Sequence, residues 1–170
     1  MIHCRRVNRE DANALARYLR QLSPQTKCYF APHPFDMDTL ASICKESYDG
    51  LQAFICLKDE VIVGYAVIKK GYSEGELYRF PGYAINMNPE TDYLLAPSVA
   101  DDFQSQGIGS IMLAFIETEL EKISAEKMVL WGGVQLRNER AVRYYTKNGF
   151  KVLGEFHHEG LDNLDMVKYL

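Results

Sequence analysis

The chain has 170 residues, of which 47% are hydrophobic and 25% charged, enough for one domain with a proper core. Its formal net charge is −4 and its basic residues form no stripe, so nucleic acid is not expected as a partner. No apolar run approaches the roughly 20 residues that span a bilayer, and the first residues lack the apolar core of a signal peptide. We therefore expect no membrane partner and a cytoplasmic location.

The cysteine pattern argues against metal and disulfide chemistry. The four cysteines are Cys4, Cys28, Cys44 and Cys56, and none of them forms a C-x-x-C pair. A zinc site or a disulfide framework is therefore not expected, and these residues are interpreted as buried or half-buried thiols. We expect no metal in this protein.

Hydrophobic periodicity predicts the elements of the first half of the chain. Asn8 stands where a helix N-cap is expected, with Asp11 three residues later, and Ser23-Pro24 is expected to end that helix. The elements expected up to residue 91 are a strand over 2–7, a helix over 12–22, an aromatic-rich loop over 24–35, a helix from 36 or 38 to about 48, a hairpin of strands over 51–57 and 61–68, and an irregular segment over 71–91 with a short strand over 77–85.

The second half alternates strands and helices. Pro97 cannot donate to a strand ladder, so it marks either a sheet edge or a bulge that separates this strand from its neighbour. The expected elements are a strand over 93–99, a long helix from 108, a strand over 128–134, a helix over 139–148 and a hairpin over 151–156 and 164–169. This order predicts a mixed sheet with helices on both faces.

Two glycines, Gly107 and Gly109, lie between a predicted strand and the long helix. The first N–H groups of a helix have no partner within it, and glycines allow an anion to approach them closely. A dinucleotide fingerprint needs a small residue where Met112 stands, and a Walker loop needs Lys where Ser110 stands. The turn therefore predicts an anion site that fits neither nucleotide motif, or simply a tight turn.

A second motif follows the next strand and indicates which kind of anion the turn would bind. The residues of the two motifs are Gln104, Gly107 and Gly109 upstream, and Asn138, Ala141, Tyr145, Gly149 and Phe150 downstream. One helix and one strand separate the two motifs. In this arrangement the chain resembles the GNAT superfamily of N-acetyltransferases. The resemblance covers the element order of the whole chain and the motif detail of about residues 92–156.

The resemblance implies both a fold and an activity. The fold is a single GNAT-type domain over residues 1–170, α/β (α+β) in class, with a central mixed, mostly antiparallel twisted sheet of about seven strands flanked by about four helices. The activity is transfer of an acetyl group from acetyl-CoA to a primary amine of a small molecule or peptide, by direct attack in a ternary complex. A homodimer through the terminal strands is compatible with the resemblance.

The resemblance also assigns the residues that bind acetyl-CoA. They are Ser98, Val99, Ala100, Gln104, Ser105, Gln106, Gly107, Ile108, Gly109, Ser110, Asn138, Ala141 and Tyr145. The backbone of 98–100 would pair with the pantetheine arm, and the N–H groups of 104–110 would hold the pyrophosphate. Asn138 either contacts the pantetheine or caps the following helix. Because Gln104 and Gln106 stand where relatives often carry a basic residue, we expect modest CoA affinity.

Acetyl transfer needs a proton donor for the thiolate and an acceptor for the amine proton. The family register assigns Tyr145 as the general acid, although a core aromatic is the alternative. Tyr93 stands where several relatives carry a catalytic Glu, so we expect deprotonation through water, with Glu76 and Asp92 as general-base candidates. The residues expected to bind the acceptor are Tyr29, Phe30, His33 and Tyr83.

Three other functions remain open from the sequence. One is a protein-lysine acetyltransferase, because the stretch over 99–104 and the Leu22-Ser23-Pro24 run are similar to small bacterial domains of that kind. Another is a non-catalytic acyl-CoA-binding domain of the same fold, which the missing carboxylate at Tyr93 favours. The last is a nucleotide-binding α/β protein, against which Met112 and Ser110 argue.

Overall fold

The computed structural model describes all 170 residues, and the chain divides into two compact units. The first unit comprises Met1–Lys69 with Ala96–Leu120, and the second comprises Lys70–Leu95 with Glu121–Leu170. Eight strands follow the order β1-β2-β3-β4-β5-β8-β6, and β7 pairs with β8. Strand β4 (Asp92–Val99) gives its first half to the second unit and its second half to the first. No helix is long and apolar enough to cross a membrane.

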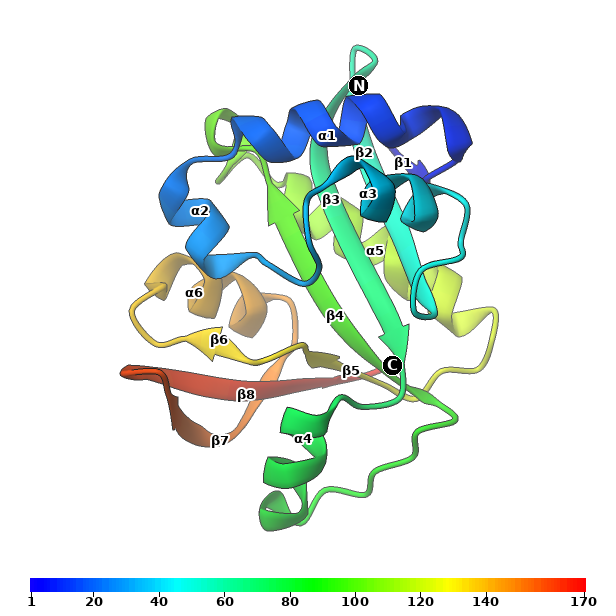
Figure 1. Cartoon of the computed structure of the whole chain (residues 1–170). Helices are drawn as coiled ribbons and strands as arrows, with labels where there is room; N and C mark the ends of the chain where they lie inside the picture. The colour runs from blue at the N-terminus through cyan, green and yellow to red at the C-terminus, as the bar shows by residue number, and fades with distance from the viewer. The chain divides into compact units, whose positions relative to one another are not determined.

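The first unit is a small sheet covered by helices (Figure 1). Its elements are β1 (Ile2–Arg6), η1 (Arg9–Asp11), α1 (Ala12–Gln21), α2 (Pro24–Tyr29), α3 (Met37–Cys44), β2 (Leu51–Lys58), β3 (Val61–Lys70), η3 (Asp101–Phe103) and α5 (Ile108–Glu121). The strands β1, β2 and β3 pair antiparallel. Helix α5 lies close to β3 at Gly64, because a Cβ built there would stand 3.4 Å from the side chains of Ile108 and Met112.

Two helix starts in this unit follow from local capping. The Asn8 side chain accepts a hydrogen bond from the Glu10 N–H, and Asp11 completes the predicted capping box. At the second start, Ser23 accepts from the Thr26 N–H and Pro24 occupies the first turn. The prediction of a loop over 24–35 is therefore wrong for 24–29, because a proline that ends one helix also suits the first turn of the next.

The interpretation of all four cysteines as thiols is wrong for one pair. Cys4 on β1 and Cys56 on β2 are partners in the antiparallel register and form a disulfide. Cys28 and Cys44 take no part in a disulfide. The sequence separation of 52 between Cys4 and Cys56 hides this pairing from sequence reasoning, because strand register alone brings the two residues opposite each other.

The second unit also combines a sheet with helices. Its elements are α4 (Glu74–Arg79), η2 (Phe80–Tyr83), β5 (Lys127–Leu130), β6 (Val134–Gln135), α6 (Glu139–Lys147), β7 (Lys151–His158) and β8 (Leu161–Tyr169). β4 and β5 run parallel, and β8 pairs antiparallel with β5, β6 and β7. A core of Phe80, Leu94, Val129 and Val167 holds the unit together.

Two predictions in this unit are wrong in detail. The expected strand over 77–85 is helical, because the segment forms α4 and η2 instead. The expected strand over 128–134 is divided into β5 and β6, because Gly132 and Gly133 both adopt left-handed backbone angles, with φ of 71° and 69°. The predicted mixed, mostly antiparallel sheet is confirmed, with eight strands where about seven were expected and six α-helices where about four were expected.

Candidate functional site

Strand β4 continues beyond the residues that pair with β5. The parallel register ends where Leu95 faces Leu130, and the Trp131 N–H then bonds to the Leu95 carbonyl at 2.9 Å. β4 nevertheless continues to Val99. The sequence placed a strand-breaking residue in this stretch, and Pro97 indeed lies two positions after the last paired residue. The stretch 96–99 therefore enters the glycine turn with no pairing to β5 in the register.

The glycine turn has the geometry of an anion cradle. Ser105 and Gly107 take left-handed backbone angles, with φ of 61° and 83°, and the backbone from Ser105 to Gly107 is exposed. Helix α5 begins directly afterwards, and its Ile111 N–H bonds to the Gly107 carbonyl at 3.1 Å. A Cβ at Gly107 would meet nothing within 4 Å, so the backbone angle rather than crowding favours glycine there. An incoming anion would meet backbone N–H groups at a helix start.

The side chains of two glutamines in the turn donate hydrogen bonds to nearby backbone carbonyls. The Gln104 amide donates to the Val99 carbonyl at 3.0 Å, and the Gln106 amide donates to the Asp102 carbonyl at 2.8 Å. Residues 98–110 contain no Lys, Arg or His and two Asp. Within this stretch, backbone dipoles are the groups that can offset the charge of a bound anion, and Lys58 is a cation beside it, with its Nζ 5.1 Å from the Phe103 ring.

Ser98, expected beside the pantetheine arm, has its side chain directed into the first unit. Its hydroxyl donates to the Tyr65 carbonyl at 3.1 Å and lies 3.0 Å from the Tyr18 hydroxyl. All three side chains are buried. Burial raises the pKa of both phenols. The Ser98 side chain thus fixes β4 against the core, so that only its backbone is left for a ligand.

Two of the expected acceptor residues lie in the core of the first unit. Phe30 packs edge-on against Tyr65, and His33 lies 2.8 Å from the Tyr65 hydroxyl. The other ring nitrogen of His33 lies 2.7 Å from the Pro34 carbonyl, so Nδ1 carries the proton and Nε2 accepts from the phenol. Burial lowers the pKa of His33. Tyr29 is only half-buried. The geometry gives Phe30 and His33 a structural role and leaves Tyr29 accessible.

The downstream motif lies in the second unit. Asn138 caps α6 by accepting from the Ala141 N–H at 3.3 Å, so the capping role is the one the structure displays. Tyr145 is buried between the rings of Tyr144 and Phe150. Burial raises the pKa of the Tyr145 phenol, which therefore stays protonated at neutral pH. A protonated phenol is what a proton donor to a thiolate requires.

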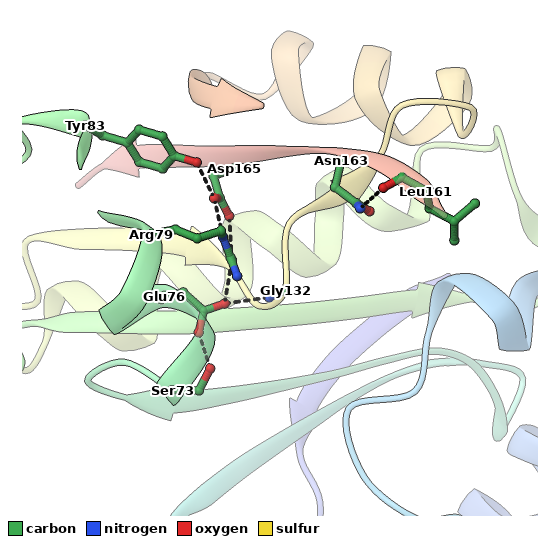
Figure 2. Close-up of polar contacts among 8 residues, drawn as sticks. All are labelled: Ser73, Glu76, Arg79, Tyr83, Gly132, Leu161, Asn163 and Asp165. Atoms are coloured by element: carbon green, nitrogen blue, oxygen red, sulfur yellow. Dashed lines mark hydrogen bonds and ion pairs between the residues drawn. The ribbon is translucent and has the colours of Figure 1, made fainter. Parts of the chain in front are cut away.

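Glu76 belongs to a buried ionic network in the second unit (Figure 2). It is 1% exposed and accepts hydrogen bonds from the Gly132 N–H, at 2.7 Å, and from Ser73. Arg79 lies 3.5 Å from the same carboxylate and also forms a two-pronged ion pair with Asp165. With its oxygens engaged in this way, Glu76 is better suited to hold the β5–β6 connection than to take up a proton directly.

Asp92, the other general-base candidate, is fully buried at the start of β4. It accepts from the Tyr72 hydroxyl and the Asn88 N–H, and Lys127 lies 2.9 Å from its other oxygen. Asp92 and Lys127 are register partners in the parallel β4–β5 pair. The geometry of Asp92 is that of a buried ion pair within the sheet.

Tyr83, the remaining acceptor candidate, is half-buried beside the same network. Its hydroxyl donates to Asp165 at 2.8 Å. Burial and the Asp165 carboxylate raise the pKa of Tyr83 to about 12. The ring lies over Gly154, where a Cβ would stand 2.4 Å from it. Gly154 therefore leaves the space that this tyrosine occupies.

Sequence reasoning missed Asp165 and the pairing of Asp101 with helix α2. Asp165 is a charged residue between Leu164 and Met166 in the middle of β8, and that is the signal by which it could have been noticed. The partners of Asp101 are Ser23 and Thr26, which lie 75 or more residues earlier in the chain. No cluster of His, Cys, Asp and Glu that could hold a metal ion occurs.

Solved structures with the same architecture define the class of protein. The GNAT domain of S. lividans PAT is 14% identical, with a TM-score of 0.76 over 99% of this chain and 90% of that one. PaiA N-acetyltransferase from Thermoplasma acidophilum, solved with coenzyme A, is 18% identical, with a TM-score of 0.70 over 100% and 99%. Ribosomal-protein-alanine N-acetyltransferase from Brucella melitensis is 19% identical, with a TM-score of 0.73 over 99% of both chains. The fold is that of the N-acetyltransferases.

The family follows from the sequence itself. The model of the acetyltransferase (GNAT) family matches residues 17–150, which include the glycine turn and the Asn138–Tyr145 motif. No curated protein is significantly similar to the chain in sequence. The chain belongs to the acetyltransferase (GNAT) family and is an acyltransferase.

Proposed function

We propose that the chain transfers an acetyl group from acetyl-CoA to the primary amine of a small molecule or peptide, by direct attack in a ternary complex. The observation that carries this proposal is the exposed glycine turn that opens α5 directly after the part of β4 beyond its register with β5, in a chain of this family. Backbone N–H groups at such a turn suit a pyrophosphate. That the T. acidophilum relative was solved with coenzyme A supports the choice of cosubstrate.

The proposed roles divide between binding and chemistry. The backbone of 98–100 pairs with the pantetheine arm, the N–H groups of 104–110 hold the pyrophosphate, and the Asn138–Ala141 turn contacts the arm. In the reaction, the amine nitrogen bonds to the acetyl carbon and the carbon–sulfur bond breaks. Tyr145 gives its proton to the thiolate, and burial, which raises the pKa of the phenol, keeps it protonated at neutral pH until the thiolate forms. The tyrosine is regenerated by solvent.

The amine proton leaves through water in this proposal. Glu76 and Asp92 are both buried and engaged by donors, so neither accepts the proton in the arrangement described. Of the two, Glu76 stands beside Gly132, one residue after the last backbone bond between β4 and β5, and is therefore the candidate for a water-mediated role. Asp92 stands at the opposite end of that strand pair.

The acceptor is proposed to contact Tyr29 and Tyr83, with Phe30 and His33 supporting the segment from within. A half-buried phenol presents both an apolar face and a polar end, which suits an amine-bearing molecule. We further propose that residues 1–170 act as one catalytic domain in the cytoplasm.

The test is a thiol-release assay with acetyl-CoA over polyamines, amino sugars, amino acids, and peptides that offer a lysine or an N-terminal alanine. We expect release with at least one class, and CoA to raise the melting temperature by mass action. Tyr145→Phe should lower kcat by about 10²-fold or more while the CoA dissociation constant stays the same. Tyr144→Phe is the matched control and should keep its kcat. No melting shift with millimolar CoA would contradict the proposal.

A non-catalytic acyl-CoA-binding domain is the second candidate. The observation that favours it is that Tyr93 replaces the family Glu and that both general-base candidates, Glu76 and Asp92, are buried. It predicts that CoA binds but that no amine class releases the thiol. Activity that depends on Tyr145 would exclude it.

A further inference from the structure

Asp101 joins the glycine turn to helix α2 within the first unit. It is the first residue of η3, between the end of β4 and the turn. Its carboxylate accepts from the Ser23 N–H at 2.9 Å, from the Ser23 hydroxyl at 2.7 Å and from the Thr26 hydroxyl at 2.7 Å. Ser23 also caps α2 through the Thr26 N–H. The residue that starts α2 is therefore the same one that holds the turn.

The hydrogen bonds of Asp101 to Ser23 and Thr26 are here called the Asp101 joint. Thr26 contributes to it from the helix side. Its buried hydroxyl lies within 3.5 Å of the Gln104 amide as well as 2.7 Å from Asp101. The same Gln104 amide donates to the Val99 carbonyl. One threonine thus contacts both the residue before the glycine turn and the residue within it. A ligand that fixes the backbone of the turn also fixes the partners of Thr26.

The segment that starts at Ser23 is held at a second point. The Phe30 N–H bonds to the Thr26 carbonyl, and His33 bonds to Tyr65 on the fully buried part of β3. The Tyr65 contact lies in the core, whereas Asp101 is exposed. Exposed hydrogen bonds open more readily than core contacts. Within residues 23–36, the start of α2 is therefore the part whose order depends most on the contact with Asp101.

We propose that Asp101 is a positioning residue that couples occupancy of the glycine turn to the order of residues 23–36. This inference rests on the proposed function, because it takes the pyrophosphate of CoA as the ligand of the turn. CoA binds the turn in the conformation that Asp101 and Gln104 hold, and so favours the closed joint with Ser23 and Thr26. Tyr29 lies in the coupled segment, so its position is tied to the same contacts.

Hydrogen exchange of the full chain, with and without CoA, tests the coupling. We expect CoA to slow exchange over residues 23–36 by about fivefold or more. Peptides from the β2–β3 hairpin serve as the internal reference. Asp101→Ala should still bind CoA and lose this protection. Asp102→Ala removes the same charge from the neighbouring exposed residue and should keep it.

Thr26→Val is a second variant, because it removes the hydroxyl while leaving the charge of the turn unchanged. It should reduce the protection in the same way as Asp101→Ala. Two results overturn the inference while leaving the proposed function standing: CoA that binds without slowing exchange over 23–36, or equal protection in the Asp101 and Asp102 variants. Absence of CoA binding to the unmodified chain overturns both proposals at once.

Discussion

At the scale of single residues, the second unit is organised around buried ionic groups. Arg79 lies between the carboxylates of Glu76 and Asp165, and its guanidinium stacks on the Phe156 ring at 3.8 Å. Asp165 is fully buried. A buried ion pair adds little net stability, but removal of one partner leaves the other charge uncompensated. The network therefore determines where α4 sits on β8 more than how stable the unit is.

Asp165→Asn tests this reasoning. We expect a loss of about 3–5 kcal/mol in the free energy of unfolding, because Arg79 and Tyr83 both lose a charged partner in the interior. Urea denaturation measures the loss. Asp162→Asn is the control on the same strand, because its ion pair with His157 is exposed, and we expect a change below about 1 kcal/mol. Equal losses of stability in the two variants would contradict the role of Asp165 as a buried partner of Arg79 and Tyr83.

His33 makes stability depend on pH. Burial lowers its pKa below the usual 6.5, so the folded state holds the imidazole neutral where the unfolded chain begins to protonate it. The folded state therefore keeps its full stability above about pH 6.5 and loses it as the pH falls towards the folded pKa. We expect the free energy of unfolding of the unmodified protein to fall more steeply below pH 6.5 than that of His33→Gln. Identical slopes in the two proteins would refute the prediction.

At the scale of elements, the β5–β6 connection determines where the strand ends. Gly132 and Gly133 share a left-handed backbone but differ in their surroundings. A Cβ at Gly132 would meet nothing within 4 Å, whereas a Cβ at Gly133 would stand 2.6 Å from the Leu164 carbonyl and 2.8 Å from the Phe156 ring. The first glycine serves the turn, and the second also allows β8 to approach.

The pair offers a matched substitution experiment. Gly132→Ala should cost about 1–2 kcal/mol, the usual penalty for a left-handed alanine. Gly133→Ala should cost about 1–3 kcal/mol more, because the backbone of β8 must also move. Thermal unfolding of both variants measures the difference. Similar melting temperatures of the two variants would show that β8 can move without a loss of stability.

At the scale of the whole molecule, the negative net charge limits the affinity for the cosubstrate. The chain carries a net charge of −4, and residues 98–110 contribute two carboxylates and no cation. An anionic CoA therefore approaches a protein of the same sign. Among these residues, the helix start and oriented N–H groups are what can hold a phosphate, and they do so without a formal charge. We expect an affinity weaker than nanomolar.

Gln106→Lys should tighten CoA binding by about two- to fivefold, since one exposed charge near an anion contributes about 0.3–1 kcal/mol. It should also make the dissociation constant more sensitive to salt. Isothermal titration at two ionic strengths measures both effects. Thr118→Lys adds the same charge on the exposed face of α5 about 15 Å along the helix and should change neither. An unaltered affinity for Gln106→Lys would mean that the turn does not hold the anion.

Patterns that are local in the sequence determined much of this protein. The strand and helix order, the Asn8 capping box and the glycine turn before α5 all follow from residues within a few positions of one another. The family motifs are local as well, which is why the acetyltransferase class could be predicted. Local patterns failed at Pro24, which starts a helix, and over 77–85, where β-forming residues adopt helical structure because Phe80 packs into the core.

Only the tertiary structure decided which groups are available for chemistry. The sequence presents His33, Phe30, Glu76 and Asp92 as candidates of equal standing, but the structure buries all four and gives each a partner or a place in the core. It likewise forms the Cys4–Cys56 disulfide and joins Asp101 to Ser23. The physical reason is that burial and pairing depend on contacts between residues far apart in the chain, whereas turn and capping preferences act within one or two turns of backbone.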